Sequence, residues 1–126
     1  MKNKYSQLLY TPLDMPTIYL SKAEDLATYI QQHRDKLVVV DFYADWCGPC
    51  KYIGKVFEQE LLPKYGDKLV LIKVDADNEA LEPLSTQFQI RGIPRLIFYY
   101  DQKIVDDVTG ADKGLIESIC NTYCSR

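Results

Sequence analysis

The sequence has little excess charge of either sign and no long apolar run. Its 126 residues carry 15 Lys and Arg against 18 Asp and Glu, a formal charge of -3. No basic stripe or arginine cluster occurs, so the chain lacks the electrostatic pattern of a nucleic-acid-binding protein. Its apolar runs are far too short to span a bilayer. We therefore expect neither a nucleic acid nor a membrane as a partner.

Metal-binding and cross-linking residues are also scarce. The chain has one histidine, His33, and four cysteines in two close pairs, Cys47 with Cys50 and Cys120 with Cys124. A stabilising disulfide framework would join distant segments, because closing a long loop removes the most entropy from the unfolded chain. Two intervening residues also suit zinc ligands, but a four-cysteine site would have to recruit the second pair from a different element. We expect redox chemistry at the first pair, with no metal and no cofactor besides a Cys47–Cys50 disulfide.

The length is that of one ordinary domain, and 47% hydrophobic residues suffice for a single core. Residues 1–16 lack periodicity and contain Pro12 and Pro16, which predicts an irregular leader before a domain over residues 17–126. This leader has no sustained apolar region before Pro12, so we do not expect it to be an intact secretory signal peptide. We expect a monomer in the cytoplasm, with a periplasmic or secreted location as the alternative if a signal peptide has been removed.

Strands and helices alternate over most of the chain. Apolar runs predict strands at residues 17–20, 37–44, 69–74, 95–100 and 104–108, and helical periodicity predicts helices at 21–33, 47–63, 81–87 and 112–123. Ser21 and Glu24 have the spacing of a capping box, and Pro63 should end the second helix. The alternation favours parallel strands, and the last two strands form an antiparallel hairpin. The expected fold is α/β, three layers around a mixed sheet of about five strands with four helices.

Cys47 and Cys50 are separated by three positions, with Cys47 at the N-terminus of a predicted helix. Both sulfurs then lie on one face within bonding distance. Unsatisfied N–H groups and the helix dipole stabilise a thiolate on Cys47 relative to the thiol. Pro49 fits the opening turn, where no N–H is needed, and Gly48 places no bulky side chain over the sulfur. These features predict Cys47 as a nucleophile and Cys50 as the thiol that resolves the mixed disulfide.

The segment Trp46-Cys47-Gly48-Pro49-Cys50-Lys51, together with the preceding residues 40–45, closely resembles the active-site segment of thioredoxins. The likeness extends through residues 73–75 and 91–94 to Gly110, and covers about residues 17–124. It implies the thioredoxin fold and a protein disulfide reductase. It also implies disulfide-containing proteins as substrates and a thioredoxin reductase, or an equivalent electron donor, as a partner. A binding or chaperone module on the same fold is the alternative, because a fold alone does not establish function.

Two charged residues interrupt the predicted central strands. Asp41 follows three valines, and burial there should raise the pKa of its carboxyl group. Lys73 lies between Ile72 and Val74 in the next strand. The resemblance implies that Asp41 takes and returns the proton of Cys50 and that Lys73 tunes it. A buried ion pair without a catalytic part is the alternative.

Pro94 follows Ile93 at the start of a predicted strand. The resemblance implies that this peptide bond is cis and faces the two cysteines, so that the backbone of Ile93 pairs with an extended substrate segment. It also implies an apolar patch around Cys47. The predicted substrate-binding residues are Trp46, Gly48, Pro49, Gly92, Ile93, Pro94, Arg95 and Gly110.

Three positions depart from the usual thioredoxin pattern. Lys55 replaces a proline that kinks the helix, Asp101-Gln102 replaces a turn containing glycine, and Arg95 replaces a threonine. Arg95 adds charge beside the docking groove, so we expect it to influence substrate choice. Outside the pattern, Cys120 is in step with the apolar side of the last helix and should be a small buried hydrophobe rather than a reactive thiol. Cys124 is near the terminus and should be more exposed, either as an incidental thiol or as a regulatory one.

Overall fold

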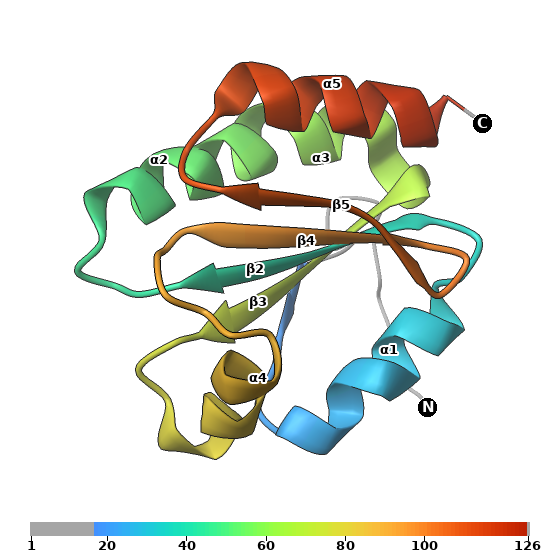
Figure 1. The fold of residues 1–126 in the computed structure, drawn as a ribbon. Coiled ribbons are helices and arrows are strands. Elements are labelled where there is room, and N and C mark those ends of the chain that lie inside the picture. Colours follow the sequence, from blue (N-terminus) through green and yellow to red (C-terminus); the bar gives the residue numbers. More distant parts are fainter. Residues whose placement is uncertain (1–16, 126) are drawn as a thin grey trace, which may run out of the picture.

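A computed structural model describes residues 17–125, and Figure 1 shows its fold. The predicted leader, residues 1–16, lies outside the described part of the chain. The strands are β1 (Thr17–Tyr19), β2 (Leu37–Tyr43), β3 (Leu69–Asp75), β4 (Arg95–Tyr100) and β5 (Lys103–Thr109). The helices are α1 (Leu26–Gln32), α2 (Gly48–Val56), α3 (Leu62–Tyr65), α4 (Glu82–Gln87) and α5 (Lys113–Cys124).

The five strands form one mixed sheet in the order β1-β3-β2-β4-β5. β1, β3 and β2 are parallel, whereas β4 is antiparallel to β2 and β5 is antiparallel to β4. The parallel neighbours β2 and β3 are joined by a helical crossover, and β4 and β5 are joined by a tight hairpin. The predicted α/β class and mixed five-stranded sheet are confirmed.

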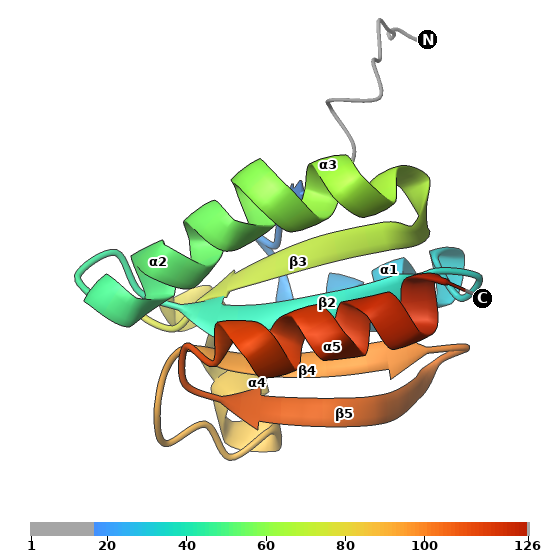
Figure 2. The ribbon, with the colours of Figure 1, turned by 90° about the horizontal axis from the view of Figure 1, so that it is seen from above.

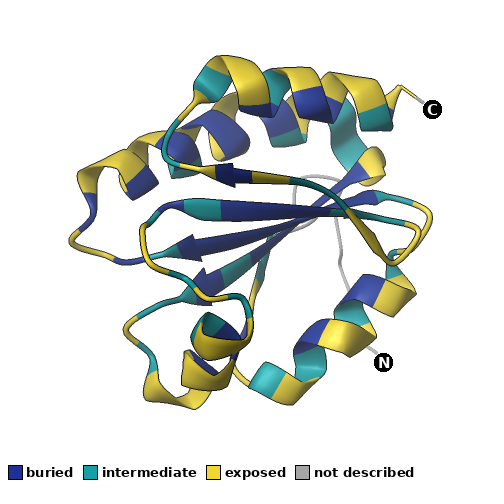
Figure 3. Cartoon of the chain, in the orientation of Figure 1, coloured by how far each residue is buried: buried dark blue, intermediate teal, exposed yellow. Residues whose placement is uncertain are grey.

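Helices cover both faces of the sheet. Figures 1 and 2 show α2, α3 and α5 on one face and α1 and α4 on the other. Leu37 and Val39 of β2 pack toward the first group, and Val38, Val40 and Phe42 pack toward the second. Residues of both parities in β2 are therefore buried, which explains its unbroken apolar run. Buried residues concentrate on the inner strands and on the inward sides of the helices (Figure 3).

The predicted end of the second helix at Pro63 is wrong. The chain stays helical through Pro63 to Tyr65, with a π-helical turn at Phe57–Leu61 between α2 and α3. Proline lacks an N–H and its ring collides with the carbonyl four residues earlier in a regular α-helix. The wider π turn changes the hydrogen-bond spacing just before the proline, which lets the helix continue.

The predicted capping box at Ser21 and Glu24 is also not formed. The first helical segment begins as a 3₁₀ turn at Ala23–Asp25, and its N-cap is Lys22, without a side-chain capping hydrogen bond. The backbone of Lys22 is still extended, so the chain begins to coil one residue later than the box requires.

Candidate active site

Cys47 and Cys50 lie where β2 is followed by α2. Cys47 is the N-cap of α2 and has an extended backbone, with φ of -88° and ψ of 110°. Its sulfur accepts a hydrogen bond of 3.2 Å from the backbone N–H of Cys50. The helix dipole and this N–H group both favour negative charge on the Cys47 sulfur. Cys47 therefore lies at the N-terminus of a helix, as predicted.

The two cysteines form a disulfide, with their Cα atoms 5.2 Å apart. Both residues are largely buried, Cys47 being 5% exposed and Cys50 3% exposed. They pack against Ala44, Tyr43 and Ile93. A disulfide accepts two electrons and two protons to become a dithiol.

The loop before β4 lies against the cysteine pair. The Ile93–Pro94 peptide bond is cis, the isomer that the resemblance implies. The carbonyl oxygen of Ile93 lies 3.9 Å from the sulfur of Cys47. The N–H of Gly110 donates to the carbonyl oxygen of Pro94 at 2.8 Å, and Gly110 has a φ of 95° that suits glycine. The structure therefore brings Cys47, Ile93, Pro94 and Gly110 together.

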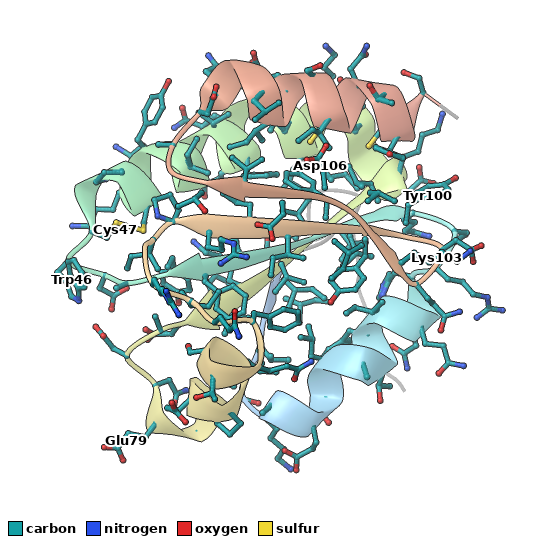
Figure 4. All side chains as sticks on the ribbon, in the orientation of Figure 1. Trp46, Cys47, Glu79, Tyr100, Lys103 and Asp106 are labelled. Atoms are coloured by element: carbon teal, nitrogen blue, oxygen red, sulfur yellow. A yellow bond between two sulfur atoms is a disulfide. The ribbon has the colours of Figure 1, made fainter. Side chains whose placement is uncertain are left out.

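Trp46 lies beside Cys47 at one end of the molecule (Figure 4). Its side chain is highly exposed, and its indole N–H donates to a carboxylate oxygen of Asp77 at 2.8 Å. This hydrogen bond holds the ring next to the cysteine pair. Asp77 is a neighbour of the site that was not predicted from sequence, because a contact across 31 positions leaves no local pattern.

Asp41 is 1% exposed and lies in register beside Lys73 of β3. Neither of its carboxylate oxygens has a hydrogen-bond partner among the described residues. Burial raises its pKa from 3.8 to about 6, and the positive charge of Lys73 partly opposes this shift. A buried carboxyl group without partners, with a pKa near neutrality, is suited to accept and release a proton.

Lys73 does not form an ion pair with Asp41 in the described part of the chain. Its ammonium nitrogen instead lies 4.2 Å from the ring centroid of Tyr43. A side chain at Gly54 would lie against that nitrogen, since a Cβ there would be 3.6 Å away from it. Asp41 and Lys73 thus interact through their charges without a direct hydrogen bond. Tyr43 is a second residue that the sequence analysis missed.

Arg95 is held by Asp107 of β5. Its guanidinium makes two hydrogen bonds to the Asp107 carboxylate, at 2.6 and 2.7 Å. This pairing raises the pKa of Arg95 and lowers that of Asp107. Arg95 is in register with Phe42, whose side chain packs toward α1 and α4, so Arg95 lies on the sheet face opposite α2. Most of its charge is therefore balanced within the protein.

Gly48, Pro49 and Gly92 flank the cysteine pair and the loop before β4. A Cβ at Gly48 would have no heavy atom within 4 Å, and one at Gly92 would be 3.7 Å from Cγ2 of Thr109. Gly48 therefore leaves open space beside the disulfide. Pro49 lies in the first turn of α2, as predicted.

The second cysteine pair is separate from this site. Cys120 and Cys124 are both buried, so the expected exposure of Cys124 is wrong. Helix α5 extends to Cys124, which places it on the same face as Cys120 and turns its sulfur toward the carbonyl oxygen of Lys68, 3.6 Å away. Burial raises the pKa of Cys120 to about 12 and that of Cys124 to about 11. Both thiols therefore stay protonated near neutral pH, and the protonated thiol is the poorer nucleophile.

Neither a metal site nor a membrane helix is present in residues 17–125. No group of three or more His, Cys, Asp or Glu side chains there could hold a metal ion. None of the helices in this range has the length and apolar character needed to cross a membrane.

Comparison with known proteins gives consistent matches. The family model described as Thioredoxin matches residues 16–121. A thioredoxin of Malassezia sympodialis is 40% identical over 84 residues, covering 67% of this chain and 78% of the relative. A thioredoxin of Mycoplasmoides gallisepticum is 45% identical over 76 residues, covering 60% of this chain and 72% of the relative. The crystal structure of reduced Schistosoma mansoni thioredoxin pre-protein matches with a TM-score of 0.75 and 38% identity, over 85% of this chain and 97% of that one.

Proposed function

Since this chain belongs to the thioredoxin family and is a thiol–disulfide oxidoreductase, we propose that it reduces protein disulfides, with Cys47 as the nucleophile and Cys50 as the resolving thiol. The observation that carries this proposal is the position of Cys47 at the N-cap of α2, where its sulfur accepts the N–H of Cys50. Within residues 17–125, Cys47 is at the N-cap of α2 and its sulfur accepts an N–H, and both features stabilise a thiolate there.

In the first step, the reduced Cys47 thiolate attacks one sulfur of a substrate disulfide. The Cys47 sulfur forms a new bond to that sulfur, the substrate bond breaks, and the second substrate sulfur leaves as a thiolate that takes a proton from solvent. The carbonyl of Ile93, 3.9 Å from the Cys47 sulfur, is placed to accept a backbone N–H of an extended substrate. The proposed docking surface comprises Trp46, Gly48, Pro49, Gly92, Ile93, Pro94 and Gly110.

In the second step, Cys50 resolves the mixed disulfide. Asp41 takes the proton of the Cys50 thiol, and the resulting thiolate attacks the sulfur of Cys47. The bond to the substrate breaks, the substrate sulfur leaves as a thiolate and is protonated, and the Cys47–Cys50 disulfide forms. Two electrons have passed from the protein to the substrate. The buried position of Asp41 and its pKa of about 6 support this role, because ionised and protonated forms are both accessible near neutral pH.

The cycle closes when an external dithiol reduces the Cys47–Cys50 disulfide. We assign this step to a thioredoxin reductase or an equivalent electron donor. The proposed cycle uses no cofactor besides the disulfide itself.

A redox titration tests this proposal. Trp46 is the only tryptophan and lies next to Cys47, so its fluorescence should report the redox state during titration against dithiothreitol buffers. We expect a potential more negative than about -230 mV, on the reducing side of the glutaredoxins, as is established for thioredoxins. A reduction potential of about -180 mV, that of protein disulfide isomerase, would contradict a reductase role.

Cysteine variants test the two roles separately. Cys47→Ser should abolish reduction of insulin disulfides, whereas Cys50→Ser should accumulate mixed disulfides at Cys47, detected by mass spectrometry. Full function of a variant that lacks both cysteines would favour the binding or chaperone module instead.

A further inference from the structure

A groove lies between α2 and the edge of the sheet formed by β3 and β1. Its volume is about 310 Å³. Lys51 and Lys55 of α2, Glu58 of the following turn, Lys73 of β3 and Tyr19 of β1 line it. We call this feature the lysine groove. Three cations and one anion therefore face the same space.

Among residues 17–125, the lysines of this groove form no ion pair within 4.0 Å of a carboxylate, although the charge of Lys73 acts on the more distant Asp41. The ion pairs formed by residues 17–125 involve Lys36, Arg95 and Lys113. Lys51 and Lys55 are separated by four positions on one helix face, where like charges repel each other. The protein therefore maintains a local positive potential that a bound anionic group would relieve.

The lining residues of the groove follow α2 and the next helical turns from Lys51 to Leu62. The groove begins next to the redox site, because Lys51 directly follows Cys50. A protein that reacts with Cys47 could therefore contact both places at once.

Building on the proposed function, we propose that the lysine groove binds an acidic segment of the protein that exchanges disulfides with Cys47. The negative charges of such a segment complement the three lysines that line the groove. The chain's own residues 1–16 have the wrong sign, since they contain Lys2 and Lys4 but only Asp14. Lys55 is central to the inference, because it stands where thioredoxins usually carry a proline and adds the second cation to this face of α2.

Matched peptides test this proposal. Two synthetic peptides share one intramolecular disulfide, flanked on each side by four Glu in the first and by four Gln in the second. The pre-reduced protein reduces each peptide in a single turnover at low and at high salt. The proteins compared are the wild type, Lys55→Gln, the double variant Lys51→Gln/Lys55→Gln, and Lys103→Gln. Lys103 is the control, because it is exposed and lies on β5 far from Cys47 (Figure 4).

The wild type should reduce the Glu peptide faster than the Gln peptide at low salt. This advantage should fall about threefold in Lys55→Gln and about tenfold in the double variant, since each exposed contact contributes modestly. It should remain in Lys103→Gln, and high salt should remove it from all proteins that show it. Equal rates for the two peptides, or an equal loss in Lys103→Gln, would overturn the proposal.

A binding measurement separates this proposal from the proposed function. Calorimetric titration of the oxidised protein with a linear Glu-rich peptide without cysteine detects the groove without any reduction. Binding that weakens in Lys55→Gln but not in Lys103→Gln supports the groove even if neither disulfide peptide is reduced, an outcome that would overturn only the reductase role. Absence of peptide binding to the wild type would overturn the inference. So would a wild-type dimer that dissociates in Lys55→Gln, because a second copy of the chain would then occupy the groove.

Discussion

Asp41 combines deep burial with two carboxylate oxygens that lack partners in the described residues. A hydrophobic residue of similar size would pack there at lower cost, since an unpaired buried polar group destabilises a fold. The buried carboxyl group therefore lowers the stability of the fold, but it places a titratable group beneath α2. This trade is expected of a residue that moves protons rather than one that holds the structure together.

The first residue-scale prediction concerns the stability of the oxidised protein with Asp41→Asn. The pKa of Asp41 is higher in the folded state than in the unfolded chain, so ionisation favours unfolding as pH rises from about 4 to about 6. Two pKa units correspond to about 3 kcal/mol. The variant should therefore gain stability relative to wild type as pH rises: its free energy of unfolding minus that of wild type should be about 3 kcal/mol larger at pH 7 than at about pH 3.5. Parallel pH curves from urea denaturation would show that Asp41 does not titrate differently on folding.

The same variant tests proton transfer. Asp41→Asn should slow the resolving step by Cys50 more than the initial attack by Cys47, because only Cys50 depends on this base. Single-turnover kinetics over about pH 6 to 9, a window around ordinary thiol pKa values, should resolve the two steps. Rates equal to wild type across that window would make Asp41 merely structural.

Arg95 provides the second residue-scale prediction. The wild type should reduce an acidic disulfide peptide faster than a matched basic one at low salt. Arg95→Thr should make this rate advantage smaller, because it removes a cation near the docking surface. Asp107→Asn should widen that difference, because it removes the carboxylate that now balances the guanidinium. Each effect should be at most about 1 kcal/mol and should decrease with added salt. The same acidic-to-basic rate ratio in wild type and both variants would exclude a part in substrate choice.

At the scale of elements, the hairpin between β4 and β5 uses an unusual pair of residues. Asp101 and Gln102 both have positive φ, 51° and 65°. Two-residue turns of this kind favour Asn-Gly or Asp-Gly, because glycine adopts positive φ without a steric cost. The chain keeps the turn because the strands on either side are paired and packed.

Gln102→Gly should therefore raise the free energy of unfolding by about 0.5 to 1 kcal/mol, as strain relief exceeds the added freedom of the unfolded chain. Urea denaturation measures this change. Gln31→Gly in α1 is the matched control and should be destabilising by a similar amount, since glycine disfavours helix. A loss of stability in Gln102→Gly would contradict this account of the turn.

At the scale of the whole molecule, the two cysteine pairs differ in the charge that their surroundings favour and not in burial, since Cys50 and Cys124 are each 3% exposed. Cys120 and Cys124 are enclosed by the core between α5 and the sheet, and their raised pKa values disfavour thiolates. Access to them therefore requires the packing of α5 to open.

Alkylation of the reduced native protein with iodoacetamide should thus modify Cys47 rapidly and leave Cys120 and Cys124 unmodified. All four cysteines should react in denaturant, and peptide mass spectrometry distinguishes the sites. Rapid native labelling of Cys124 would show that α5 opens locally and would restore a regulatory role for that thiol.

The local features of this protein were predictable from sequence. Alternating apolar segments indicated the mixed sheet, and the two-residue spacing after a buried strand indicated the redox pair at a helix N-terminus. The cis Ile93–Pro94 bond followed from the resemblance to thioredoxins. These features depend on hydrogen bonds and side-chain positions within a few residues, or on motifs that lie in order along the chain.

Only the tertiary structure decided the contacts between segments that are distant in sequence. The hydrogen bond from Trp46 to Asp77, the placement of Lys73 over Tyr43 and the pairing of Arg95 with Asp107 all depend on strand register and loop packing. Packing also buried Cys124, contrary to the prediction from its position near the terminus. Such contacts have no local signature, because the free energy that selects them comes from burying whole elements against one another.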